Sequence, residues 1–105
     1  MTVGYGFNAL LTAKPGMADR LVDVLLTGMD DGNPASSEHC LVYLVCRSAS
    51  RPDLIHVTEG WTSEADHHRL FADEAAQAIV ARIQDLVTGE NPRTDYTPIG
   101  GKADL

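Results

Sequence analysis

The sequence predicts an α+β domain whose strands and helices follow the order β-α-β-β-α-β. Two observations support this prediction. Apolar and polar residues alternate along several short segments, as they do in strands. Other segments repeat apolar residues every three or four positions, as amphipathic helices do. The expected strands are Val3–Ala13, Cys40–Arg47, Leu54–Trp61 and Arg93–Ile99, and the expected helical segments are 17–29, 63–71 and 73–89.

The first strand is followed by Pro15-Gly16, a pair of residues that breaks regular structure and turns the chain. Because side chains alternate along a strand, Phe7 lies on one face and Asn8 and Leu10 lie on the other. In the helix that follows, apolar residues recur at helical spacing, and charged residues are left for solvent. A polar loop containing glycine and proline then ends this helix.

The second and third strands are expected to pair as an antiparallel hairpin, because a short polar turn containing Pro52 separates them. The alternation of the third strand places Glu59 and Trp61 on the same face. Ser63 is then expected to cap a short helix that continues through Phe71, by analogy with the capping box.

A longer helix is expected to be capped by Asp73 and to end near Gly89. Its apolar stripe consists of Ala76, Ile79, Val80, Ile83, Leu86 and Val87. The complete order is the ferredoxin-like arrangement, with one four-stranded antiparallel sheet. Helices can cover only one face of such a sheet, so we expect a second copy of the chain to cover the other face in a homodimer.

The length and charge of the chain limit its possible partners. Its 105 residues fit a single domain spanning 1–105. The net charge is -7, and the eight Lys and Arg residues form no cluster, which argues against nucleic acid and against anionic membrane surfaces. No apolar run approaches the roughly 18 residues of a membrane span, and the N-terminus lacks the pattern of a signal peptide. A cytoplasmic location is therefore expected.

The two cysteines, Cys40 and Cys46, lie six residues apart in one predicted strand. At about 3.3 Å per residue they are separated by about 20 Å, which is too far for a disulfide. Their spacing also supports no metal site. Both are expected to be small core or near-core residues.

Two segments together resemble the antibiotic biosynthesis monooxygenase family. The first is Leu11-Thr12-Ala13-Lys14-Pro15-Gly16, and the second is Val57-Thr58-Glu59-Gly60-Trp61-Thr62-Ser63-Glu64-Ala65. The resemblance covers nearly the whole chain. It implies a ferredoxin-like fold that pairs into a dimeric α+β barrel. It also implies oxidation of a small phenolic, quinol or polyketide-like substrate by dioxygen, the co-substrate, without metal, flavin or other cofactor.

In this family a pocket lies between the sheet and the helices, and the resemblance suggests which residues form it. Asn8 occupies the place of a first-strand Asn and would donate a hydrogen bond to reduced oxygen. Its alternative is a solvent-facing or edge-strand residue that bonds a neighbouring loop. Trp61 occupies the family's Trp position and would form a flat wall for an aromatic ring, or would simply be core. Tyr43 matches a frequent family Tyr that would bond a substrate oxygen, and its alternative is half-buried strand packing.

Histidine is the natural general base near neutral pH, and the chain offers His67 and His68. Successive helical residues point about 100° apart, so only one of them can face the pocket. We expect this residue to be His68, which lies one turn before Phe71 and Ala72, although a surface position is the alternative for both. Many relatives carry a His nine or ten residues after the Trp, whereas the gaps here are six and seven.

Further residues are expected to bind the substrate or to form ordinary core. They are Phe7, Leu10, Glu59, Leu70, Phe71 and Ile79. A buried Glu59 would need a partner, for which Arg82 and Arg93 are candidates. A cyclase or isomerase of polyketide-like compounds, or a non-catalytic module that binds a small aromatic molecule, remains an alternative to the oxygenase. Haem degradation is disfavoured by the acidic surface, the short Trp-to-His gap and the absence of a basic patch.

Overall fold

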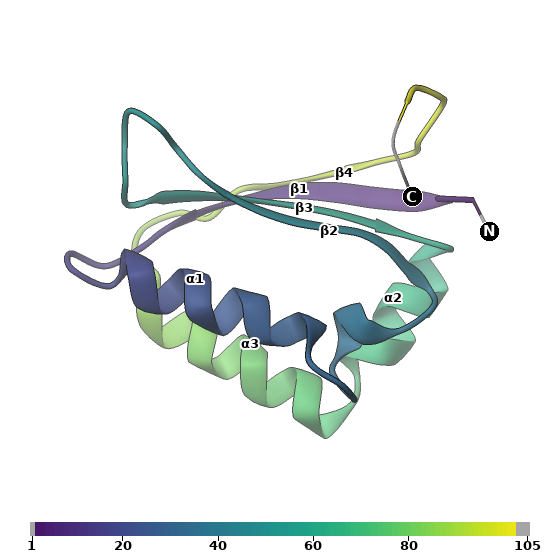
Figure 1. The fold of residues 1–105 in the computed structure, drawn as a ribbon, viewed down its shortest axis with the longest axis horizontal. Helices are drawn as coiled ribbons and strands as arrows, with labels where there is room; N and C mark the ends of the chain where they lie inside the picture. Colours follow the sequence, from purple (N-terminus) through teal and green to yellow (C-terminus); the bar gives the residue numbers. More distant parts are fainter. Residues whose placement is uncertain (1, 103–105) are drawn as a thin grey trace.

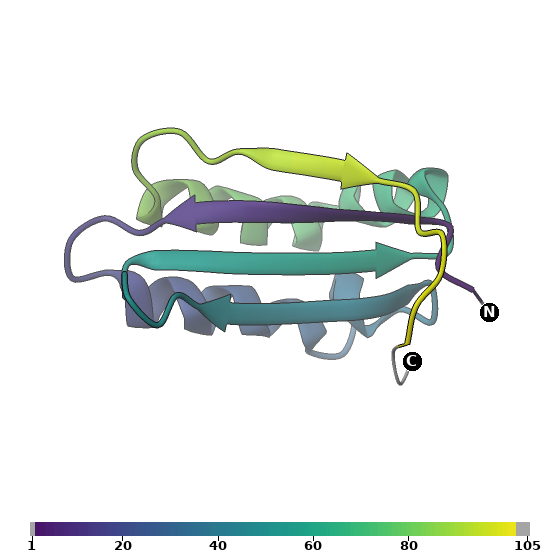
Figure 2. The ribbon, with the colours of Figure 1, turned by 90° about the horizontal axis from the view of Figure 1, so that it is seen from above.

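Four antiparallel strands form one sheet in the computed structural model, which describes residues 2–102. The strand order across the sheet is β2-β3-β1-β4 (Figure 2). β1 lies at the centre and pairs with both β3 and β4. The strands are β1 (Tyr5–Thr12), β2 (Cys40–Arg47), β3 (Leu54–Trp61) and β4 (Arg93–Tyr96). The predicted ferredoxin-like α+β fold is therefore confirmed.

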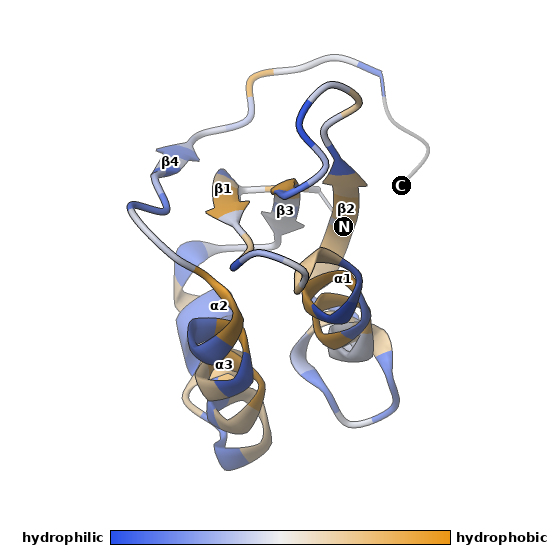
Figure 3. Cartoon of the chain, turned by 90° about the vertical axis from the view of Figure 1, so that its left-hand side faces the viewer, coloured by the Kyte–Doolittle hydropathy of each residue, from blue (hydrophilic) through white to orange (hydrophobic). Residues whose placement is uncertain are grey.

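The helices all lie on one side of this sheet (Figures 1 and 3). The α-helices are α1 (Ala18–Leu26), α2 (Glu64–Phe71) and α3 (Glu74–Leu86), and two short 3₁₀ turns are η1 (Thr27–Met29) and η2 (Pro34–Ser36). The backbone N–H of Asp66 donates to the Ser63 hydroxyl at 3.0 Å, which confirms the predicted cap of α2. The Asp73 side chain forms no such bond at the start of α3.

Two elements end earlier than the sequence predicts. α1 gives way to η1 after Leu26, in a segment where the chain passes close to β2. A Cβ on Gly28 would lie only 2.9 Å from the hydroxyl oxygen of Tyr43, so any larger residue there would have to displace the Tyr43 side chain. β4 ends at Tyr96 instead of Ile99, because Pro98 has no N–H to donate to a neighbouring strand.

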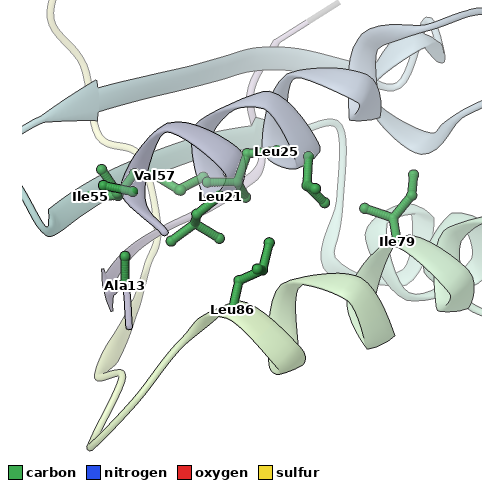
Figure 4. Close-up of a cluster of buried hydrophobic side chains, with 9 residues drawn as sticks. Ala13, Leu21, Leu25, Ile55, Val57, Ile79 and Leu86 are labelled. Atoms are coloured by element: carbon green, nitrogen blue, oxygen red, sulfur yellow. The ribbon is translucent and has the colours of Figure 1, made fainter. Parts of the chain in front are cut away.

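The main core lies between the sheet, α1 and α3. Figure 4 shows side chains from both helices and from β3 meeting there. Leu21 of α1 and Ile55 of β3 are fully buried in this cluster. A second, aromatic cluster contains Tyr5, Phe7 and Trp61, and it lies beside α2. This second cluster is where the candidate site forms.

The other face of the sheet carries no helix from the described residues (Figure 2). Leu44 and Tyr96 are exposed there, and Val42 is half-buried. Cys46 is also exposed, because it lies near the end of β2 and points away from the helices, so its predicted core position is wrong. Cys40 is half-buried, as a near-core residue would be. No helix in residues 2–102 has the length and apolar character needed to cross a membrane.

Candidate functional site

A cavity of about 370 Å³ opens between the helix-covered face of the sheet and helices α2 and α3. This volume lies in the range of small-molecule pockets. Most of its lining side chains are apolar, and a few polar groups converge on the same space. The lining residues are Phe7, Ala9, Leu11, Leu25, Val57, Glu59, His67, Phe71, Val80, Ile83, Gln84, Asn91 and Arg93.

Glu59 is a buried carboxyl group in the wall of this cavity, with only 6% of its surface exposed. Its position on β3 places it beside Phe7 of β1. The indole N–H of Trp61 donates to Glu59 Oε1 at 2.9 Å. Burial raises the pKa of Glu59 from its ordinary value of 4.5 to about 7, although the Trp61 bond and the charge of Arg93 act in the opposite direction. Near neutral pH this carboxyl can therefore both accept and release a proton.

His67 is the second polar group in the cavity wall, and it is 5% exposed. Aromatic rings surround it, with centroids 5.2 Å away at Trp61, 5.3 Å at Phe7 and 4.6 Å at Phe71. Its Nδ1 is buried and has no hydrogen-bond partner among the described residues. Burial, reinforced by the charges of Arg93 and His68, lowers the pKa of His67 from 6.5 to about 4. The imidazole is therefore neutral at physiological pH.

Arg93 reaches the cavity from β4. The central carbon of its guanidinium group lies over the Phe7 ring, 3.7 Å from the centroid. Its Nε donates to Asp95 Oδ1 at 3.0 Å, and its Nη2 donates to the Tyr5 hydroxyl, which itself donates to Asp95 Oδ1 at 3.0 Å. Glu59 has no ion pair within 4.0 Å in the described part of the chain. The carboxyl group of Glu59 and the guanidinium group of Arg93 thus line the same cavity without forming an ion pair with each other.

The structure brings four of the predicted residues together. Phe7, Glu59, His67 and Phe71 all line the cavity. Trp61 is fully buried behind them, where it holds Glu59 through its indole N–H, so it acts as core and as a positioning residue. The remaining helix residues, Leu70 and Ile79, pack in the two core clusters and do not line the cavity.

The prediction for Asn8 is not met, because this residue lies on the opposite face of the sheet. Asn8 is exposed, and its Oδ1 accepts a hydrogen bond from the Thr58 hydroxyl at 2.8 Å. Leu10 shares this face. The strand alternation explains the result, since Phe7 is buried towards the helices and its neighbour must point away. Phe7 and Asn8 therefore cannot line one pocket.

The preference for His68 is wrong. The His68 side chain is 63% exposed and lies 4.0 Å from Glu64, whereas His67 is buried. The inward face of α2 contains His67, Leu70 and Phe71, which are three and four residues apart. Tyr43 also lies outside the cavity, because its hydroxyl donates to the carbonyl of Leu25 at 2.7 Å. This is the half-buried packing that the sequence left as its alternative.

Arg93 is the main site residue that the sequence did not indicate, apart from its candidacy as a partner for Glu59. The useful signal was the buried carboxyl itself, which needs a compensating group nearby. Gln84 and Asn91 also line the cavity, and no feature of the sequence indicated that they would. Among residues 2–102, no three His, Cys, Asp or Glu side chains gather in a geometry that could hold a metal ion.

A ferredoxin-like α+β domain with a mostly apolar cavity between sheet and helices, into which a few polar groups converge, defines the class of this protein. The antibiotic biosynthesis monooxygenase family model matches residues 5–82, and the chain belongs to this family. A solved structure described as a candidate antibiotic biosynthesis monooxygenase from Chloroflexus aurantiacus is similar, with 27% identity, a TM-score of 0.81 and coverage of 94% of this chain and 96% of that one. No curated protein matches the sequence.

Two further solved structures, also described as candidate members of this family, show the same fold. One is from Deinococcus radiodurans, with 22% identity, a TM-score of 0.76 and coverage of 96% of this chain and 97% of that chain. The other is from Caulobacter crescentus, with 20% identity, a TM-score of 0.78 and coverage of 93% and 92%. These structures share the fold of this chain over more than nine-tenths of its length, which includes residues after the segment 5–82 that the family model matches.

Proposed function

We propose that this protein is a cofactor-independent monooxygenase that oxidises a small phenolic, quinol or polyketide-like substrate with dioxygen. Family membership supports the general class of reaction. The observation that supports the specific chemistry is Glu59, a buried carboxyl group whose pKa of about 7 suits a general base at neutral pH. It faces an apolar cavity of a size that suits a small aromatic ring system.

In the proposed reaction, Glu59 accepts the proton of the substrate hydroxyl. The resulting phenolate is electron-rich enough to transfer electrons directly to dioxygen. One oxygen atom enters the ring at a C–H position para to the hydroxyl, and the other leaves as water. The phenol loses four electrons and becomes a quinone, so that phenol and dioxygen give quinone and water. The apolar walls exclude bulk water from the intermediates.

His67 has a separate role in this proposal. A neutral imidazole can donate a hydrogen bond from one ring nitrogen and accept one at the other. Because Nδ1 has no hydrogen-bond partner among residues 2–102, a small movement of the ring would make it available to the reduced oxygen species or to the substrate. Trp61 does not react and instead holds the Glu59 carboxyl through its indole N–H.

Oxygen uptake against a panel of quinols and polyketide-like phenols tests the proposed reaction. We expect saturable uptake that persists after the protein is treated with a chelator. Asn8→Ala tests whether Asn8 takes part in the reaction. Its position on the opposite face of the sheet predicts unchanged turnover, whereas the role implied by the family resemblance predicts a loss of turnover. Absence of uptake with all compounds, together with ligand-induced thermal stabilisation, would contradict the oxygenase and favour the isomerase or the binding module.

We also propose that the chain forms a homodimer through the uncovered face of the sheet. Leu44 is 55% exposed on this face, and the half-buried Leu10 and Val42 extend its apolar surface. Leu44→Glu is expected to shift the dimer towards monomer, because two charges would be buried at a twofold-related contact. Sedimentation equilibrium measures this shift. Met29→Glu, on the helical side, is the matched control, and a wild-type monomer would contradict the proposal.

A further inference from the structure

Arg93 is the one Lys or Arg side chain among the described residues that line the cavity. Its hydrogen bonds use only part of its donor capacity. Nε and Nη2 are held by Asp95 and Tyr5, and Nη1 has no hydrogen-bond partner within residues 2–102. Five N–H groups are available on a guanidinium group, so this arrangement fixes its orientation and leaves donors for a ligand. Stacking on Phe7 fixes it further.

A contribution of the Arg93–Asp95 ion pair to folding stability does not explain why an arginine lines the cavity. The side chain of Asp95 is 57% exposed, and such a solvent-exposed pair contributes little to folding stability. The chain as a whole carries a net charge of -7, which would repel an anionic ligand from most of its surface. The fixed positive charge of Arg93 therefore makes the cavity a place that attracts anionic ligands, whereas most of the protein surface repels them.

We propose that the substrate carries a carboxylate group that binds Arg93, at the end of the molecule away from its reacting hydroxyl. A planar, oriented guanidinium group is the side chain best suited to carboxylate recognition. Glu59 and Arg93 come from the two strands that flank β1, on either side of Phe7, so they can contact different groups of one ligand. Glu59 disfavours a second carboxylate beside it and receives the hydroxyl, while Arg93 receives the acid. This assignment of the two ends rests on the proposed role of Glu59 as the base.

A matched pair of ligands tests the proposal. 6-Hydroxy-2-naphthoate has a hydroxyl and a carboxylate at opposite ends of a bicyclic ring, and 2-naphthol lacks the carboxylate. Isothermal titration of the 105-residue chain without oxygen is expected to show at least about tenfold tighter binding of the acid. Arg93→Gln should abolish this preference while the affinity for 2-naphthol stays within about twofold.

Arg51→Gln is the control for net charge, because it makes the same charge change in the turn between β2 and β3, away from the cavity. It should keep the preference for the acid. Equal binding of both ligands, binding of neither, or a preference that survives in Arg93→Gln would overturn the proposal. A preference that depends on Arg93 but comes without oxygen uptake from any phenolic acid would uphold this inference and contradict the oxygenase.

Discussion

Glu59→Gln is expected to lower turnover by at least about a hundredfold, because a carboxamide cannot accept the substrate proton. General bases typically contribute about 10²–10⁴ to a rate. The substitution keeps the size of the side chain and an oxygen acceptor for the Trp61 indole N–H, so the cavity should keep its shape. Steady-state oxygen uptake measures the effect, and ligand binding without oxygen shows whether the substrate still enters. A variant with wild-type turnover would remove Glu59 from the mechanism.

The pH dependence of turnover provides an independent measurement of the same group. The proposed base is active only when ionised, and burial raises the pKa of Glu59 to about 7. Turnover is therefore expected to rise with pH through about pH 7 and to level off above it. The remaining activity of Glu59→Gln should lack this rise. A wild-type profile that is flat between pH 5 and 9 would contradict the assignment.

The same substitution is expected to stabilise the fold at alkaline pH. Below pH 4.5 the carboxyl is protonated in both the folded and the unfolded chain. Between pH 4.5 and about 7 the unfolded chain releases the proton and the folded chain keeps it, so the free energy of unfolding decreases as pH rises. At pH 8, Glu59→Gln should be more stable than the wild type by about 1–3 kcal/mol in urea denaturation. Loss of activity together with a gain in stability is typical of a functional buried charge.

His67→Phe is expected to remove an acid-dependent loss of stability. Above pH 6.5 the imidazole is neutral in both the folded and the unfolded chain. Between pH 6.5 and about 4 the unfolded chain binds a proton that the buried ring does not, so the free energy of unfolding decreases as pH falls. The wild type should lose about 1–3 kcal/mol relative to His67→Phe across this range. Comparing the two proteins at each pH cancels the opposite contribution of Glu59.

The turnover of His67→Phe separates a catalytic role from packing. Phenylalanine keeps the aromatic contacts with Trp61 and Phe71 and lacks the ring nitrogens, so the fold should be retained. Loss of one hydrogen bond in the transition state corresponds to about a tenfold decrease in turnover. His68→Gln is the matched control, because this neighbouring side chain is exposed, and it should change neither property. Unchanged turnover in His67→Phe would restrict His67 to a structural role.

The amino-acid sequence by itself determined the order of the elements and the two faces of each strand. The bounds of β2 and β3 follow directly from their apolar alternation, and Ser63 caps α2 as its position predicts. The same alternation already separated Phe7 from Asn8. It therefore contained the reason why the resemblance-based role of Asn8 does not fit the cavity. These features are local, because a strand's two-residue period and a cap depend on neighbours in the chain.

The tertiary structure alone decided which polar groups share the cavity. The choice between His67 and His68 depends on the rotation of α2 against the aromatic cluster, and two adjacent histidines give no periodic signal for it. Arg93 belongs to a short edge strand, all of whose residues are exposed, and it enters the site because β4 pairs with β1 and its side chain extends over Phe7. The shifted pKa of Glu59 likewise depends on burial by residues distant in sequence, a property that its strand position alone does not provide.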